Sequence, residues 1–132
     1  MTDSKIRPFL MFEGNAEEAM NFYVSLFPYS KLQAVDRYKA GGPGREGSIR
    51  QASFSIGSQT VLCTDSYVKH RFTFTPSFSF YVECRSEEEL DRYYAALVDR
   101  GAMLMPPDNY GFSRKFAWVN DRFGVSWQLN LA

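Results

Sequence analysis

The sequence is short of residues that cross-link, chelate or titrate near neutral pH. Its 132 residues include two cysteines, Cys63 and Cys84, and a single histidine, His70. Two cysteines are too few for the disulfide framework of a small secreted domain, so we expect reduced thiols in a cytoplasmic protein. The first residues lack the apolar run of a signal peptide, and no segment approaches the length of a membrane span.

A net charge is also missing. Fifteen Lys and Arg residues balance 15 Asp and Glu residues, and no basic cluster interrupts the chain. We therefore expect neither nucleic acid nor a membrane as a partner. Hydrophobic residues make up 45% of the chain and aromatic residues 17%, which excludes a disordered chain and favours one folded domain over residues 1–132.

Apolar spacing in the first half predicts a strand, a helix and three more strands. The first strand should cover Ile6–Glu13, and Asn15 should cap the helix with Glu18 as its partner. Pro28 should end the helix because its ring clashes with a continuing turn. Three strands should follow, at residues 32–38, 50–56 and 59–64.

The segment between the second and third of these strands is rich in glycine. Residues 39–48 contain Gly41, Gly42, Gly44 and Gly47. A phosphate-binding loop is one interpretation, but such a loop ends in Gly-Lys followed by Ser or Thr and leads from a strand into a helix. Because the sequence has neither feature here, we interpret residues 39–48 as a flexible loop.

The second half predicts the same order of elements. A strand over Ser77–Glu83 should precede a helix that is capped by Ser86 and Glu89 and stopped at Gly101. The pair Pro106–Pro107 is expected in a turn. Three strands complete this half, at residues 103–105, 112–120 and 125–131.

The two halves also share residues at a constant offset of 70. Three residues of the first half recur in the second: Glu13, Glu17 and Tyr23 become Glu83, Glu87 and Tyr93 (83 − 13, 87 − 17 and 93 − 23). A repeat of this kind predicts two modules that pack together. They should cover about residues 5–66 and 75–131.

Four stretches of the chain resemble one known group of proteins. They are residues 12–23, 69–77, 116–119 and 121–128, the last of which reads Asp-Arg-Phe-Gly-Val-Ser-Trp-Gln. Together with the duplicated modules, they make the chain similar to the vicinal oxygen chelate superfamily, which includes glyoxalase I, bleomycin-resistance proteins and extradiol dioxygenases. Within this superfamily the chain resembles the PhnB-like branch, often labelled 3-demethylubiquinone 3-methyltransferase-like.

The resemblance implies an α+β fold in which two tandem βαβββ modules form a cupped mixed sheet with the helices outside. It also implies a homodimer and a small-molecule ligand inside the cup. The methyltransferase label, by contrast, has no support in the sequence. A methyl donor such as S-adenosylmethionine is usually held by a glycine-rich turn in a doubly wound sheet, and this order of elements does not predict that sheet.

The same resemblance implies four metal-ligand positions, which other members fill with His, Glu or Gln. In this sequence they map to Pro8, Leu62 or Cys63, Ser77 and Gln128. Only Gln128 offers a competent donor, its amide carbonyl oxygen, whereas a catalytic metal usually needs about three protein ligands. We therefore predict no metal ligand and no cofactor, and keep a divalent metal as the alternative.

Strand alternation predicts which side chains face the ligand. If Gln128 points into the cup, its neighbour Trp127 points toward the helices, and Phe78 and Phe80 lie under the second helix. In the first strand Leu10 should face the cup as Phe12 does. The predicted ligand-contacting residues are Phe12, Gln51, Ser53, Ser77, Ser79, Tyr81, Phe112 and Gln128. They suit a small, partly apolar, uncharged ligand.

Two residues are candidates for catalysis, His70 as a general base and Tyr81 in a metal-free reaction. No carboxylate or nucleophile lies near His70 in the sequence, so no triad is predicted. PhnB-like relatives carry His in place of Gln51, whose amide cannot act as a base. Cys63 and Cys84 sit in or beside apolar strands, and we interpret both as buried, unreactive thiols.

Three kinds of function remain open. We favour a ligand-binding protein without metal chemistry, of the bleomycin-resistance type, because the implied metal ligands are missing beside an intact pattern of ligand-facing residues. One alternative is a lyase, isomerase or dioxygenase, with or without a metal. The other is a structural dimer whose cup is filled by its own aromatic side chains. The fold alone does not choose among them.

Overall fold

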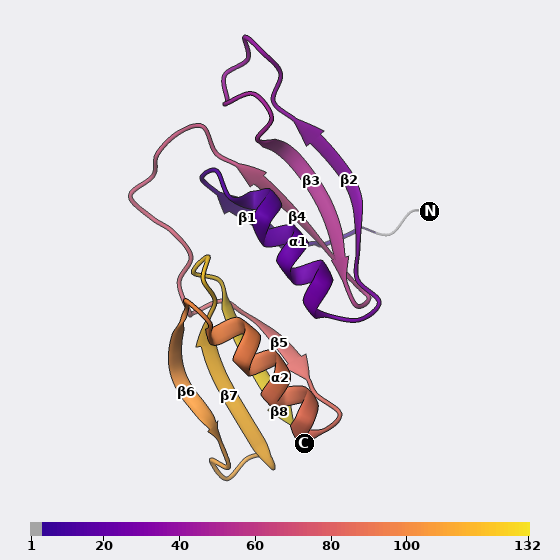
Figure 1. Cartoon of the computed structure of the whole chain (residues 1–132), viewed down its shortest axis with the longest axis vertical. Coiled ribbons are helices and arrows are strands. Elements are labelled where there is room, and N and C mark those ends of the chain that lie inside the picture. The colour runs from indigo at the N-terminus through magenta and orange to yellow at the C-terminus, as the bar shows by residue number, and fades with distance from the viewer. Residues whose placement is uncertain (1–3) are drawn as a thin grey trace. The chain divides into compact units, whose positions relative to one another are not determined.

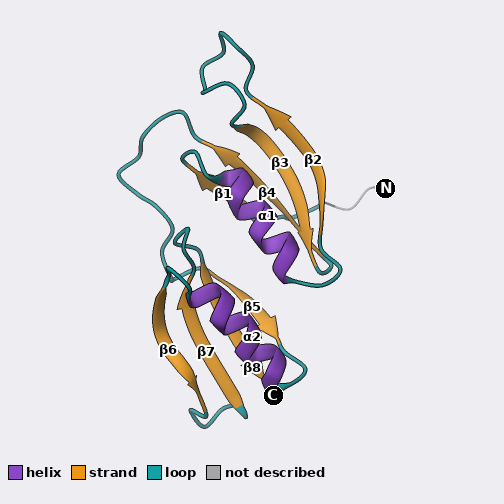
Figure 2. Cartoon of the chain, in the orientation of Figure 1, coloured by secondary structure: helices purple, strands orange, loops and turns teal. Residues whose placement is uncertain are grey.

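The computed structural model describes residues 4–132. The chain divides into two compact units, Met1–His70 and Arg71–Ala132, each with one helix against one face of a four-stranded sheet (Figure 1). The last strand of the first unit and the first strand of the second are joined by residues 66–78, which form no helix or strand (Figure 2). No helix among residues 4–132 is long and apolar enough to cross a membrane.

The first unit follows the predicted order of strand, helix and three strands. Its elements are β1 (Phe9–Phe12), α1 (Ala16–Leu26), β2 (Lys31–Arg37), β3 (Ile49–Ile56) and β4 (Gln59–Asp65). The strand order is β1-β4-β3-β2, with β1 parallel to β4 and the other pairs antiparallel. β1 is shorter than predicted and starts only after Pro8, which has no N–H to give to a ladder.

The second unit repeats this topology. Its elements are β5 (Ser79–Glu83), α2 (Glu87–Val98), β6 (Ala102–Asp108), β7 (Lys115–Asn120) and β8 (Ser126–Leu131), in the sheet order β5-β8-β7-β6. Phe9 pairs with Leu62 in the first unit as Ser79 pairs with Ser126 in the second. The predicted repeat, with its offset of 70 at the first strand, is therefore confirmed, as is the α+β fold of two tandem βαβββ modules.

The pair Pro106–Pro107 lies inside β6 rather than in the predicted turn. β6 is an edge strand, where a missing N–H on the outer side costs no ladder bond. The register of β6 against β7 shifts twice, between Met103 and Met105 and between Met105 and Asp108. The prolines are therefore accommodated by an irregular edge, and the strand extends to Asp108.

Ring contacts identify the sheet face that packs under α1. Phe54 of β3 stacks on Tyr23 of α1 with ring centroids 6.2 Å apart, and both side chains are fully buried. Ladder pairing and alternation place Cys63, and Leu10 opposite it, on the same face. The prediction that Leu10 and Phe12 face a ligand is therefore wrong. Both face α1. The sequence could not show this, because every residue of β1 is apolar and no alternation of residue types marks one face of the strand.

In the second unit Trp127 of β8 marks the face under α2. Its indole is 1% exposed and lies against Phe80 of β5, with ring centroids 4.8 Å apart. Lys115 of β7, on the same face, pairs with Asp91 of α2 at 2.9 Å. The predicted orientations of Trp127 and Phe80 are confirmed, and Gln128 lies on the opposite face.

The two helices are capped differently. At α2, Ser86 Oγ accepts a hydrogen bond from the backbone N–H three residues later at 3.1 Å, as predicted. At α1, Asn15 makes no side-chain capping bond. The carboxylate of Asp65, at the end of β4, instead accepts hydrogen bonds from Gly14 N and Ala16 N at 2.8 and 3.0 Å. Asn15 thus occupies the N-cap position as predicted, but its side chain does not cap the helix, and Asp65, distant in sequence, satisfies the N–H of the first helical residue instead.

α2 ends at the predicted place, but the role of Gly101 differs from the expected one. Arg100, not Gly101, takes the left-handed conformation, with φ 60°. A Cβ on Gly101 would overlap the carbonyl oxygen of Asn120. Glycine is needed there because the end of β7 approaches the backbone closely.

The glycine-rich loop between β2 and β3 folds over Tyr38. This side chain is 8% exposed, and a Cβ on Gly44 would overlap its ring. Tyr38 N donates to Ser48 O at 2.9 Å, and Gly47 N donates to Tyr38 O at 3.0 Å. The prediction of a loop at residues 39–48 is confirmed. Its glycines were interpreted as a source of flexibility, but Gly44 instead allows the loop to pack closely against the buried ring of Tyr38.

The turn between β7 and β8 is built on Asp121, which is 3% exposed. Its Oδ1 accepts hydrogen bonds from Phe123 N at 2.8 Å and from Val125 N at 3.0 Å. Its Oδ2 accepts one from Trp127 Nε1 at 2.9 Å. The stretch 121–128, the most distinctive part of the sequence, therefore closes a turn and orients the core indole of β8.

Replacing Asp121 with Asn should lower the free energy of unfolding by about 3 kcal/mol, because an amide presents a donor where the carboxylate accepts. Urea unfolding of Asp121→Asn measures this change. The matched control is Asp99→Asn, whose side chain is 61% exposed in its ion pairs. This variant should change stability by no more than about 0.5 kcal/mol. Equal effects of the two substitutions would contradict the structural role given to Asp121.

Candidate functional site

The second sheet presents a polar face on the side away from α2. Ladder pairing arranges this face in three rows across β5, β8, β7 and β6. The rows are Ser79–Ser126–Asn120–Ala102, Tyr81–Gln128–Trp118–Met105 and Glu83–Asn130–Phe116–Asp108. We call these positions the polar face. It combines hydroxyl, amide and carboxylate groups with the apolar surface of three aromatic side chains, Tyr81, Trp118 and Phe116.

Hydrogen bonds link the first two rows of the polar face. Trp118 Nε1 donates to Ser126 Oγ at 2.8 Å, and the hydroxyls of Ser126 and Ser79 are 2.6 Å apart. Gln128 Nε2 donates to Ser79 Oγ at 3.3 Å. This network holds the Gln128 amide and the Trp118 ring in fixed positions, and groups fixed in this way bind a ligand at a lower ordering cost than mobile ones.

The third row contains an amide whose oxygen has no donor. Asn130 Nδ2 donates to Glu83 Oε1 at 3.3 Å. A carboxylate can only accept, so this contact fixes which way the amide points. Asn130 Oδ1, like Asn120 Oδ1 in the first row, is buried and accepts no hydrogen bond from residues 4–132. Such orphaned oxygens are uncommon in folded proteins.

Three of the eight predicted ligand-contacting residues lie on the polar face: Ser79, Tyr81 and Gln128. Gln51 and Ser53 lie on the corresponding face of the first sheet, away from α1. A role in ligand binding stays a prediction for all five.

The other three predicted residues occupy different places. Phe12 faces α1 and is 3% exposed, as described above. Ser77 lies before β5, where its hydroxyl is 2.7 Å from that of Thr75. Phe112 lies in the loop before β7, with its ring 5.0 Å from that of Phe116. Phe78 also precedes β5 and is 62% exposed. The prediction that it lies under α2 is therefore wrong.

The predicted set of ligand-contacting residues omits Glu83, Trp118 and Asn130. The signal that could have found them is alternation. Glu83 shares parity with Tyr81, and Asn130 shares parity with Gln128. Trp118 pairs with Gln128 across the ladder and is only partly buried.

The structure narrows the metal-ligand positions implied by the resemblance. Cys63 faces α1 and is fully buried, so Leu62, which has no donor, is the residue on the opposite face. The equivalence of Leu62 with Ser126 makes Thr64 the counterpart of Gln128. Thr64 Oγ1 already donates to Arg50 O at 2.6 Å. Among residues 4–132, no three His, Cys, Asp or Glu side chains gather closely enough to hold a metal ion.

The two catalytic candidates have different surroundings. His70 Nε2 lies 3.0 Å from Ser66 Oγ, and His70 N donates to Glu13 Oε2 at 3.3 Å, contacts that tie the segment after β4 to the β1–α1 turn. Tyr81 is 53% exposed. Burial of its hydroxyl, and secondarily the Glu83 charge, raise the pKa of Tyr81. Its phenol is therefore protonated at neutral pH and suited to donate a hydrogen bond.

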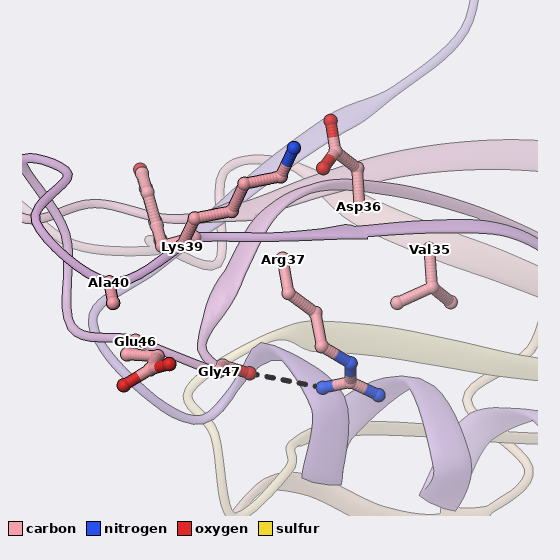
Figure 3. Close-up of a pocket in the computed structure, with 8 residues that line it drawn as sticks. Val35, Asp36, Arg37, Lys39, Ala40, Glu46 and Gly47 are labelled. Atoms are coloured by element: carbon pink, nitrogen blue, oxygen red, sulfur yellow. Dashed lines mark hydrogen bonds between the residues drawn. The ribbon is translucent and has the colours of Figure 1, made fainter.

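Two clefts flank the glycine-rich loop of the first unit. The larger, of about 570 Å³, is lined by the end of β2 and by the loop (Figure 3). Its Arg37 donates to Gly47 O at 3.0 Å and forms a bidentate pair with Glu17 of α1 at 2.7 Å. The smaller, of about 230 Å³, includes Asp65, whose oxygens both accept backbone hydrogen bonds. These two charged side chains anchor the loop and the helix start.

The two-module architecture is like that of the vicinal oxygen chelate fold. The fosfomycin resistance protein FosX from Listeria monocytogenes has a TM-score of 0.63 to this chain, covering 100% of this chain and 95% of FosX. The two sequences are 12% identical, so this likeness shows the fold alone.

Nearer relatives define the family. A Bacillus cereus structure described as a putative 3-demethylubiquinone-9 3-methyltransferase, PhnB protein, is 55% identical, with a TM-score of 0.95 over 98% of this chain and 100% of that one. Protein PA1353 from Pseudomonas aeruginosa is 26% identical, with a TM-score of 0.84 over 98% of each chain. Protein YjdN of Escherichia coli (strain K12) is 21% identical over 96% of this chain and 94% of its own.

The model of the family described as 3-demethylubiquinone-9 3-methyltransferase matches residues 4–130. The chain belongs to this family. The resemblance to the PhnB-like branch, found from four short stretches of sequence, is thereby confirmed.

Both cysteines are buried free thiols, as predicted. Burial, and then the charge of Asp65, raise the pKa of Cys63 to about 12. Burial, and then the charge of Glu89, raise the pKa of Cys84 to about 11. The nucleophilic thiolate is therefore scarce at neutral pH, and neither residue is suited to nucleophilic catalysis.

Neither thiol should react with Ellman's reagent in the folded protein at pH 8, and both should react in urea. Cys63→Ala and Cys84→Ala assign any reaction to one residue. Because both pKa values are raised on folding, the thiols contribute stability fully below about pH 9, the ordinary thiol pKa. This stability is lost as the pH rises from about 9 toward 12. Rapid labelling of the native protein would contradict the burial described here.

Proposed function

We propose that this chain binds a small, partly apolar molecule on the polar face of its second sheet. The observation that carries the proposal is the network of Ser79, Ser126, Gln128 and Trp118, which holds polar groups in fixed positions on a sheet face. Sheet faces that serve only packing are apolar, as the faces under α1 and α2 are. Polar groups set among aromatic rings are typical of small-molecule sites.

The family's descriptive name suggests methyl transfer. The residues of this chain fit the binding of a small molecule better than they fit that reaction. Cofactors with anionic groups often use the free N–H groups of a helix N-terminus after a strand. At α1 the carboxylate of Asp65 accepts from one of these N–H groups, that of Ala16, and at α2 Ser86 accepts from another. Each sheet is a four-stranded mixed sheet with its helix on one face, rather than a doubly wound parallel sheet.

Metal chemistry is a weaker fit for the same face. Gln128 offers one carbonyl oxygen, and Tyr81, beside it in the ladder, is a protonated phenol at neutral pH. The implied counterpart in the first unit, Thr64, uses its hydroxyl in a hydrogen bond to the backbone. These groups are suited to hydrogen bonding with a ligand more than to holding a borderline divalent cation.

The two tryptophans provide an internal test. Trp118 Nε1 lies on the polar face, whereas Trp127 Nε1 is bound to Asp121 in the core. Titration with benzyl alcohol, a neutral partly apolar probe, should shift the ¹⁵N-HSQC indole signal of Trp118 and leave that of Trp127 in place. Gln128→Leu should weaken binding about fivefold, the value of one neutral hydrogen bond.

The matched control for this experiment is Gln33→Leu, an exposed position of β2 in the other unit. It should leave the affinity for benzyl alcohol unchanged. A Trp118 signal that stays in place at saturating probe would overturn the proposal. So would equal losses of affinity in the two variants.

A further inference from the structure

We infer that the third row of the polar face recognises a cationic amine: the ammonium group of a small amphipathic molecule binds between Asn130 Oδ1 and the carboxylate of Glu83. This inference rests on the proposed function and specifies its ligand. It replaces the uncharged ligand expected from the sequence, which was drawn from a residue set that did not include Glu83 or Asn130.

The first argument is the state of Asn130. Its side chain is 7% exposed, and its Oδ1 has no donor among residues 4–132. The contact from Nδ2 to Glu83 Oε1 excludes the flipped amide, because a carbonyl oxygen would then face a carboxylate. A buried acceptor without a donor costs free energy in the unliganded protein. A ligand that supplies an N–H or O–H recovers this cost on binding.

The second argument is the charge of Glu83. Glu83 forms no ion pair with residues 4–132, and its side chain accepts a hydrogen bond from the neutral Asn130 amide. Two basic residues of the second unit pair with other acids: Arg85, two residues after Glu83, with Glu89, and Lys115 of β7 with Asp91 and Glu87. An uncompensated carboxylate beside an orphaned carbonyl oxygen favours a donor that carries positive charge.

The third argument is what the rest of the face can offer. Three donors there are already used, since Trp118 donates to Ser126, Gln128 to Ser79 and Asn130 to Glu83. Tyr81 in the second row keeps its phenolic O–H, whereas the third row presents the oxygens of Asn130 and Glu83, to which an ammonium group with three N–H donors is complementary. The apolar part of the ligand has Phe116 in the same row, with Phe112 against it.

Three aromatic probes of similar size and different charge are benzylammonium, benzyl alcohol and benzoate, each titrated while the Trp118 indole is observed. Benzylammonium should bind about tenfold more tightly than benzyl alcohol, the difference between a charged and a neutral hydrogen bond. Benzoate should be the weakest of the three. Glu83→Gln keeps an acceptor for Asn130 and removes the charge, so the tenfold preference should disappear while the affinity for benzyl alcohol stays the same.

Glu88→Gln is the matched control, because Glu88 is an exposed acid on α2, on the other side of the sheet. It should keep the preference for benzylammonium. An unchanged Trp127 indole signal in both variants shows that the second unit is folded. Equal binding of amine and alcohol, or a preference that survives Glu83→Gln, would overturn this inference and leave the proposed function standing. If no probe shifts the Trp118 indole, both fail.

Discussion

The second unit depends on the buried indole of Trp127. Its ring packs against Phe80 on the face under α2, and its N–H is held by the Asp121 carboxylate at 2.9 Å. Because side chains alternate along a strand, this one anchor decides the direction of every side chain in β8. A slip of one residue would bury Gln128 under α2 and expose Trp127. The placement of the polar face is thus a consequence of where the largest core side chain sits.

The sequence predicts side-chain orientation better in the second unit than in the first, because the alternation of residue types is clear in β8 and absent in β1. β8 alternates polar and apolar residues, so the orientations of Trp127 and Gln128 were readable before the fold was known. β1 reads Phe-Leu-Met-Phe, where no residue type marks a face, and the orientation of Phe12 was predicted wrongly. Alternation is informative only when one face of the strand meets water or polar groups.

Contacts distant in sequence account for another part of what could not be predicted. Asp65 accepts hydrogen bonds from Gly14 N, Ala16 N and Ile49 N, which joins the start of α1 to the ends of two strands. A local pattern at residues 15–18 predicted a side-chain cap there, and such patterns cannot reveal an acceptor 49 residues away that holds the helix start. Ser86 caps α2 as its local pattern predicted.

The duplicated modules have diverged on the faces that their helices leave open. At equivalent positions of the paired strands, Phe9 and Met11 stand where the second unit has Ser79 and Tyr81, and Thr64 stands where it has Gln128. The folds are the same because the faces under α1 and α2 keep the same apolar pattern. The hydrogen-bonding network of Ser79, Ser126, Gln128 and Trp118 lies in the second unit. Substitutions on the open face of a sheet do not disturb the packing of the other face against its helix. The ligand site that we propose therefore lies in the second module, where the Trp127 anchor holds the strand in register.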